Sequence, residues 1–320
     1  MFYTKINNRR YLGNKYRILP FIKQTIAENC GDFESFADIF AGTGAVSSAY
    51  TDKILYTNDI LYSNYLCHLT WFSNEVFDIQ KIENYINLYN SDIPFEENYM
   101  TQNFSGTYFS DKVCSRIGFI RENIENEFKS GKINSRERAM LITSLLYGID
   151  KIANTCGHYD AYRKNAALPE SFTMCVPEPN ANLKHNHCFN EDTNELVKKI
   201  SADVVYIDPP YNSRQYCDAY HLIENIARWE KPEVFGVAKK MDRTALKSKY
   251  CTREAPAAFE DLIKNISAKY IVVSYNNMAK KGNDRSNARI SDSQILETLE
   301  NKGDVKTFSQ PLKAFTTGKS

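Results

Sequence analysis

Long apolar runs are missing from this chain of 320 residues. No stretch reaches the roughly 18 to 20 consecutive apolar residues that cross a bilayer, and no apolar segment follows the basic, polar first residues. The sequence therefore predicts a protein that has no membrane partner and works in the cytoplasm.

Closely spaced cysteine pairs are also missing. The chain has 8 Cys, but none of them form the Cys-x-x-Cys pattern with which many zinc sites begin. His185, His187 and Cys188 offer donor atoms, but they lie in an Asn-rich segment that we expect to be a loop, and they have no second ligand pair. We therefore expect no metal, and thiols that a reducing cytoplasm keeps free.

A surplus of either charge is absent too, because 40 Lys and Arg stand against 39 Asp and Glu, a net charge of +1. This balance leaves binding to a polyanion undecided. Apolar and aromatic residues are plentiful, with 42% hydrophobic residues, 21 Tyr and 18 Phe. That supply excludes general disorder and suits one large or two modest folded domains.

Short apolar runs that end at glycine or acidic residues predict strands. The first run, residues 36–40, follows a helical pattern over 16–30 and leads into the turn Ala41-Gly42-Thr43-Gly44-Ala45. A second run, 54–57, ends at Asn58-Asp59. The spacing between the two runs suits a strand, helix, strand unit, so we expect a helix after the glycine turn.

Later segments continue the alternation. Residues 203–207 and 270–274 have the apolar composition of buried strands, and an amphipathic helix is predicted over 257–267 between them. This order of elements predicts an α/β fold with a parallel, doubly wound, Rossmann-like sheet.

The composition changes between residues 61 and 184, where Asn, Tyr, Ser, Glu and Lys dominate and helical patterns cover 113–128 and 136–152. We interpret 61–184 as a mainly helical insertion that houses substrate specificity, and 1–60 with 185–320 as one discontinuous catalytic domain.

The glycine turn predicts a nucleoside cofactor. Gly42 and Gly44 let backbone approach a ligand at the carboxyl end of the sheet, and Asp59 can accept ribose hydroxyls at the end of the next strand. The same arrangement serves NAD, FAD and S-adenosylmethionine, and it also occurs in plain turns. Ser47 stands where the dinucleotide fingerprint has its third glycine, which favours S-adenosylmethionine.

The segment Asp208-Pro209-Pro210-Tyr211 follows a predicted buried strand. Two prolines fix the backbone and remove two N–H donors, so rigid carbonyls remain that can only accept hydrogen bonds. Asp208 and the Pro209 carbonyl can bind both protons of an exocyclic amine, and Tyr211 offers a ring on which an extruded base can stack. Taken alone the segment can be a strand-ending turn. A glycine turn of cofactor type earlier in the chain favours catalysis.

With these motifs in place, the chain resembles the Dam-like, alpha-group adenine-specific DNA methyltransferases. Four segments match in order: Tyr11 to Lys15, Phe36 to Ser47, Asn58-Asp59, and Asp208 to Asn212. The run from Asp208 to Trp229 further resembles the FokI-type restriction-modification methyltransferases.

The resemblance implies roles for individual residues. Tyr11 and Lys15 would contact the methionine part of S-adenosylmethionine, Asp59 its ribose and Asp192 its adenine amino group, with Glu191 as the neighbouring alternative to Asp192. The implied cofactor residues are Tyr11, Lys15, Asp38, Phe40, Ala41, Gly42, Thr43, Gly44, Asp59, Ile60, Asp192 and Asp208. The implied catalytic residues are Asp208, Pro209, Pro210 and Tyr211.

The resemblance also implies a duplex DNA substrate, base flipping, a monomeric enzyme and a cognate restriction endonuclease as partner. Candidate DNA contacts are Asn212, Arg214 and Gln215 beside the catalytic motif and Tyr162, Arg163 and Lys164 in a basic, aromatic segment. Further basic clusters lie at Lys239 to Arg243, at Lys247 to Tyr250 and at Lys280-Lys281. A charge cluster can equally be a solvated surface.

Two alternatives remain open on the sequence. An RNA adenine or other exocyclic-amine methyltransferase would use the same motif, and a non-catalytic DNA-binding module would keep the sheet without needing Asp208 or Asp59. The last residues, Phe315 to Ser320, resemble the middle of the family's final hairpin, which leaves open whether the chain is a fragment or whether another domain has been removed.

Overall fold

The computed structural model describes residues 2–9, 11–179, 184–276 and 288–310. Its centre is a five-stranded parallel sheet with the order β5-β3-β2-β6-β7. The strands are β2 (Ser35–Asp38), β3 (Ile54–Asn58), β5 (His187–Phe189), β6 (Ser201–Ile207) and β7 (Ser267–Val273). The predicted α/β class with a Rossmann-like sheet is confirmed.

Alternating side chains bury both faces of this sheet, as parallel sheets require. Phe36, Val204 and Tyr206 face one apolar cluster, which the helices α1 (Leu19–Asn29) and α2 (Tyr62–Phe72) complete. Val205 and Ile207 face another cluster, completed by α10 (Ala255–Asn265) and the flanking helices. These flanking helices are α7 (Thr193–Leu196) and α11 (Asp292–Glu300).

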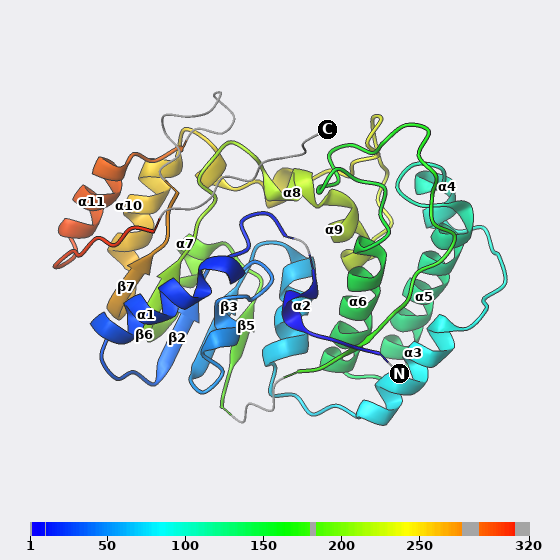
Figure 1. The fold of residues 1–320 in the computed structure, drawn as a ribbon, viewed down its shortest axis with the longest axis horizontal. Coiled ribbons are helices and arrows are strands. Elements are labelled where there is room, and N and C mark those ends of the chain that lie inside the picture. The colour runs from blue at the N-terminus through cyan, green and yellow to red at the C-terminus, as the bar shows by residue number, and fades with distance from the viewer. Residues whose placement is uncertain (1, 10, 180–183, 277–287, 311–320) are drawn as a thin grey trace.

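The remaining helices pack beside the sheet rather than on it (Figure 1). They are α3 (Ile79–Asn90), α4 (Tyr99–Phe104), α5 (Asp111–Lys129), α6 (Ser135–Asp150), α8 (Tyr216–Ala219) and α9 (His221–Arg228). Short 3-10 turns and a small two-stranded sheet complete the chain: Ile6–Asn8, Tyr16–Ile18, Ser47–Ala49, Thr244–Leu246, Lys249–Cys251, β1 (Tyr3–Thr4) and β4 (Val176–Pro177).

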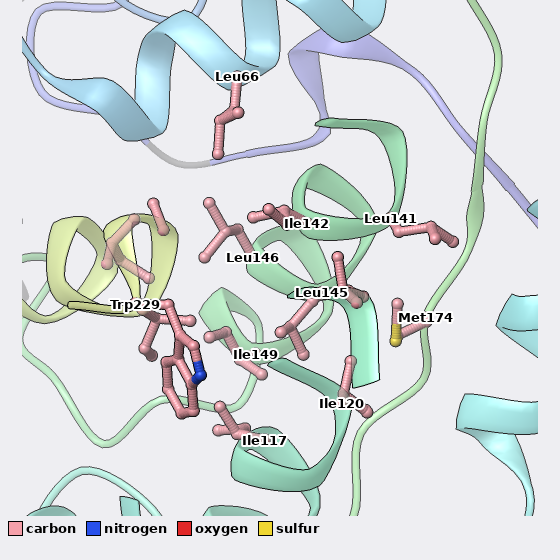
Figure 2. Packing of buried hydrophobic residues seen from close by; sticks show 14 of the residues in the cluster. Leu66, Ile117, Ile120, Leu141, Ile142, Leu145, Leu146, Ile149, Met174 and Trp229 are labelled. Carbon is pink, nitrogen blue, oxygen red and sulfur yellow. The ribbon is translucent and has the colours of Figure 1, made fainter. Parts of the chain in front are cut away.

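One apolar core unites these helices. Leu145, Leu146 and Ile149 of α6 pack with Ile117 of α5 and with Trp229 at the end of α9 (Figure 2). Helices α8 and α9 come from the segment after Asp208-Pro209-Pro210-Tyr211, yet their buried side chains belong to this core. The boundary of the insertion at residues 61–184 stays a prediction.

The expected helix after the glycine turn is wrong. Instead the chain forms turns and one 3-10 helix, Ser47–Ala49. The Asp38 carboxylate accepts hydrogen bonds from the Ser47 N–H at 3.2 Å and the Ser47 hydroxyl at 2.8 Å, which fixes this short path. Thr43, Val46 and Ser47 are also poor helix formers.

Two further expectations concern other parts of the chain. The segment around His187 and Cys188, predicted as loop, is strand β5, which pairs with β3. Lys280-Lys281 and the presumed hairpin at Phe315 to Ser320 lie outside the described residues. Within the parts that the structure describes, no helix is long and apolar enough to span a membrane, and no cluster of three or more His, Cys, Asp or Glu could hold a metal.

Candidate active site

The strand order places the site. The chain leaves β2 toward β3 on one side, while β6 lies on the other side of β2, so a crevice opens at the carboxyl ends of β2 and β6. The glycine turn, Asp59 and Asp208 follow β2, β3 and β6, and all of them line one cavity of about 540 Å³. The predicted site residues in its lining are Tyr11, Lys15, Asp38, Phe40, Ala41, Gly42, Thr43, Asp59, Ile60, Asp192, Asp208, Pro210 and Gln215.

Asp59 stabilises the glycine turn through hydrogen bonds. Its carboxylate oxygens accept hydrogen bonds from the backbone N–H groups of Gly42 and Leu61, both at 2.9 Å. Burial raises the pKa of Asp59 to about 7. Gly42 has φ +54, and a Cβ there would lie 3.0 Å from the Tyr11 ring, so both conformation and space require glycine.

Gly44 is placed differently from Gly42. It has φ +84, but the space that a Cβ would take is filled by Phe72 at 2.7 Å and by Ile6, and Gly44 is not among the residues lining the cavity. The structure therefore gives Gly44 a packing contact, and its cofactor role stays a prediction.

Asp38 lies beneath the turn with 1% of its surface exposed. Burial raises its pKa to about 7, although the hydrogen bonds from Ser47 act in the opposite direction. Asp38, which is buried, and Asp59, which is partly buried, thus both contribute carboxylates to the cavity lining.

Asp208 forms an ion pair across the cavity. Its Oδ2 lies 2.5 Å from Lys15 Nζ, and the lysine also donates to the Gly13 carbonyl at 3.1 Å. Burial raises the pKa of Asp208 and Lys15 opposes that shift. The lysine therefore favours the carboxylate form, which can only accept hydrogen bonds.

The rest of the catalytic motif lies around Asp208. Pro210 lines the cavity, whereas Pro209 and Tyr211 are not among the lining residues. The Tyr211 ring meets the Tyr275 ring edge-on at 6.4 Å, and the Tyr211 carbonyl accepts from Arg289 N–H at 2.8 Å. Tyr211 is thus held from the β7 side.

Asp192 caps the helix α7, where its carboxylate accepts from the N–H groups of Asn194 and Glu195. Asp192 and Glu195 line the cavity. Glu191 pairs with Lys199 and is not in the lining. Of the two neighbouring acids, the structure brings Asp192 to the other predicted cofactor residues.

The predicted DNA contacts fall into two groups. Asn212 accepts from Arg214 N–H at 3.0 Å, and Arg214 is exposed. Gln215 donates to the Ser248 carbonyl at 3.0 Å and accepts from Ser248 N–H at 2.8 Å, so its amide holds the segment 245–250 that lines the cavity. The second group, which does not line the cavity, is Tyr162, Arg163 and Lys164.

Comparison with known proteins agrees with this geometry. Residues 11–284 match the D12 class N6 adenine-specific DNA methyltransferases. The chain belongs to this family.

Curated relatives support the assignment. The chain is 32% identical over 303 residues to modification methylase LlaI of Lactococcus lactis subsp. lactis, which covers 84% of this chain and 46% of LlaI. It is 34% identical over 323 residues to type II methyltransferase M.FokI of Planomicrobium okeanokoites, covering 93% and 48%. It is 30% identical over 326 residues to M.NlaIII of Neisseria lactamica, covering 97% and 93%.

The chain therefore spans about half the length of LlaI and M.FokI and nearly all of M.NlaIII. The resemblance predicted from the motifs, including that to the FokI-type methyltransferases, is confirmed.

Three tyrosines complete the site in this family member. Tyr11 stacks on Tyr220 at 4.7 Å and lies 5.6 Å from Tyr216. The Tyr220 hydroxyl accepts from Leu12 N–H at 2.7 Å, and Asn64 donates to the Tyr11 hydroxyl at 2.8 Å. On the sequence alone, Tyr216, Tyr220 and His221 could cover the site or pack the following helix onto the sheet. Tyr216 lines the cavity, whereas Tyr220 is buried in the helical core beside the sheet.

His68 was not found from the sequence. It is fully buried, and its Nε2 lies 2.8 Å from the Gly42 carbonyl, which can only accept. The imidazole is therefore the tautomer with a proton on Nε2. Burial lowers the pKa of His68 to about 4. No local pattern signals this role, because a histidine on an apolar helix face is usually a core residue.

We expect His68 to make folding sensitive to acid. Its pKa is about 4 when folded and about 6.5 when unfolded, so between these values only the unfolded chain binds the proton. Stability conferred by His68 is therefore present above about pH 6.5 and lost as the pH falls toward 4. Relative to His68→Gln, the wild type should lose about 2 kcal/mol of unfolding free energy between pH 7.5 and pH 5.

Urea unfolding at both pH values measures this difference, because comparison with the variant cancels the opposite contributions of Asp38 and Asp59. His185→Gln, at an exposed histidine, is the control. A pH-independent difference between wild type and His68→Gln would contradict the assignment.

Proposed function

We propose that this chain transfers a methyl group from S-adenosylmethionine to the exocyclic N6 amine of a flipped adenine in a specific duplex DNA sequence. The observation that carries the proposal is one cavity shared by Asp208 and the Gly42 turn. An amine acceptor and a nucleoside site are thereby within one molecule's length of each other, as methyl transfer requires.

The cavity suits the cofactor. About 540 Å³ accommodates a nucleoside with an amino-acid chain, and the lining combines a glycine turn with the carboxylates of Asp38, Asp59 and Asp192. Tyr11 and Lys15 would hold the methionine part, Asp59 the ribose and Asp192 the adenine. When bound, S-adenosylmethionine supplies an electrophilic methyl group on a sulfonium.

Asp208 would orient the target amine. Its carboxylate and the Pro209 carbonyl accept the two N–H bonds, which draws the nitrogen toward tetrahedral geometry and exposes its lone pair. Lys15 supports this role because its ammonium group favours the carboxylate form of Asp208, against the effect of burial on the pKa. Pro209 and Pro210 fix the loop, and Tyr211, braced by Tyr275, would stack on the flipped adenine.

The biological setting follows from the relatives, which are named modification methylases and type II methyltransferases. We propose the same role in a restriction-modification system for this chain, with residues 61–184 as the target-recognition insertion and a cognate endonuclease as partner. The chain would act as a monomer in the cytoplasm, where its DNA substrate lies.

Transfer of labelled methyl from S-adenosylmethionine to unmethylated duplex DNA of mixed sequence tests the proposal. We expect N6-methyladenine on nucleoside analysis and methylated adenines in one sequence context on sequencing. A parallel reaction contains structured RNA. Label in RNA alone would favour the RNA methyltransferase, and bound cofactor without any transfer would favour the non-catalytic DNA-binding module.

A further inference from the structure

We propose that the hairpin formed by residues 235–240 inserts its apolar tip, Phe235 and Val237, into duplex DNA beside the target adenine. There it would fill the space that the flipped base leaves in the stack. This inference rests on the proposed function and adds a surface and a physical task to it.

The tip is apolar and exposed. Phe235 is 56% exposed and Val237 is 74% exposed, on either side of Gly236, which has φ +69 and open space around its α-carbon. The hairpin is nevertheless ordered, because Phe235 and Lys240 exchange two backbone hydrogen bonds at 2.8 and 2.9 Å. Two neighbouring large apolar side chains at a projecting turn are a different case from apolar residues scattered singly over a surface.

The base of the hairpin is rigidly anchored. The buried Tyr108 hydroxyl lies between two carbonyl acceptors, at 2.7 Å from Tyr159 and 3.0 Å from Ala238, and Lys240 pairs with Asp160 at 2.7 Å. Arg243, just after the hairpin, pairs with Asp218 at 2.7 Å. A side chain that inserts into DNA needs such anchoring, because ordering a mobile hairpin on insertion would cost conformational entropy.

These anchors connect the tip to the catalytic motif. Asp218 lies in α8, which begins at Tyr216 directly after the catalytic loop. Gln215 at the end of that loop forms two hydrogen bonds with Ser248, which follows the hairpin in the sequence. Figure 1 shows the chain after α9 rising on the same side of the molecule as α8. The loop that carries Asp208 and the hairpin are thus connected through α8 and through the hydrogen bonds between Gln215 and Ser248.

Cations beside the tip suit a phosphate backbone. Tyr108, which anchors the hairpin, also contacts the Tyr162 ring at 5.4 Å. Tyr162 precedes Arg163 and Lys164, both exposed and without an ion pair among the described residues. The nearby acids Asp160 and Asp218 are neutralised by Lys240 and Arg243. The surface therefore combines the exposed apolar side chains of the tip with the unpaired positive charges of Arg163 and Lys164, which suits binding to duplex DNA.

Insertion of the tip would lower the free-energy cost of base flipping. Extruding a base from a duplex costs a few kcal/mol of stacking and pairing, and apolar wedges between base steps offset part of that cost. Phe235 and Val237 can fill the gap without competing for base hydrogen bonds. Their removal should therefore slow methyl transfer on paired DNA, where flipping is hard.

The test uses the full chain with Phe235→Ser and Val237→Ser combined, on a duplex whose target adenine is mapped from the wild-type reaction. Single-turnover methylation is measured on the paired duplex and on one with an abasic site opposite the target. The control variant combines Phe95→Ser and Val76→Ser, at side chains with matching exposure of 58% and 82%.

We expect the tip variant to be roughly 10-fold slower than the wild type on the paired duplex and within about 2-fold of it on the abasic duplex. The control should match the wild type on both. Equal slowing of methyl transfer on both duplexes, or no slowing on either, would overturn the proposed wedge. The purified system contains no other protein, so loss of a contact with a protein partner cannot cause the slowing. A wild type that methylates no DNA would instead overturn the proposed function.

Discussion

Asp208→Ala is expected to slow methyl transfer by roughly 1,000-fold while S-adenosylmethionine binding changes by less than about 10-fold. In the proposed mechanism the carboxylate is the acceptor that orients the amine, whereas the glycine turn, Asp59 and Asp192 lie elsewhere in the cavity lining. Removing Asp208 also frees Lys15, which keeps its contact with the Gly13 carbonyl. The glycine turn proposed to bind the cofactor should therefore persist.

Calorimetric binding and single-turnover transfer on the same samples separate the two effects. Asp208→Asn keeps the size of the side chain and one acceptor oxygen, so its rate should lie between those of the wild type and the alanine variant. Asp242→Ala is the matched control, at an exposed acid in the segment after the same motif. Parallel loss of rate and cofactor affinity in Asp208→Ala would show that Asp208 serves mainly in cofactor binding.

Glu224→Ala should reduce the unfolding free energy by about 3 kcal/mol. Helix α2 begins without a side-chain cap, because Leu61 stands at its N-cap position. Glu224 replaces the cap from another helix, accepting from Tyr62 N–H at 2.8 Å and Ser63 N–H at 2.9 Å. Glu224 is fully buried, so alanine would leave both donors without a partner.

Urea unfolding measures the loss, and Glu230→Ala provides the control. Glu230 also contacts Arg228, at 3.8 Å, but its side chain is 70% exposed, so its removal should change stability by less than about 0.5 kcal/mol. Because α2 follows Asp59, Ile60 and Leu61, all in the cavity lining, cofactor binding should weaken along with stability. A loss below about 1 kcal/mol would contradict the capping role.

The sequence predicted those parts of the site that depend on neighbours along the chain. A strand that ends in a glycine turn, an acid after the next strand and two consecutive prolines are local patterns with direct geometric meaning. They lead correctly to the cavity at Gly42, Asp59 and Asp208. The helix expected after Gly44 failed because a contact between Asp38 and Ser47 shortens that connection.

Residues that act across large sequence distances were not predictable. His68 reaches the Gly42 carbonyl, and Glu224 reaches the start of α2. Each partner is fixed only when helices from different parts of the chain pack together, and one sequence carries no signal of that pairing. Gln215 was predicted as a candidate DNA contact, and its amide is engaged with Ser248.

The core shared by α6 and α9 restricts how this enzyme can be recombined with its relatives. A chimera that exchanges residues 61–184 alone would set foreign helices against Leu222, Ile226 and Trp229, which share one apolar core with residues of α5 and α6. Grafting a new sequence preference onto this catalytic sheet therefore requires a donor segment together with its own α8 and α9. A new DNA sequence specificity would then have to be transferred as two chain segments together, the insertion and the segment that forms α8 and α9.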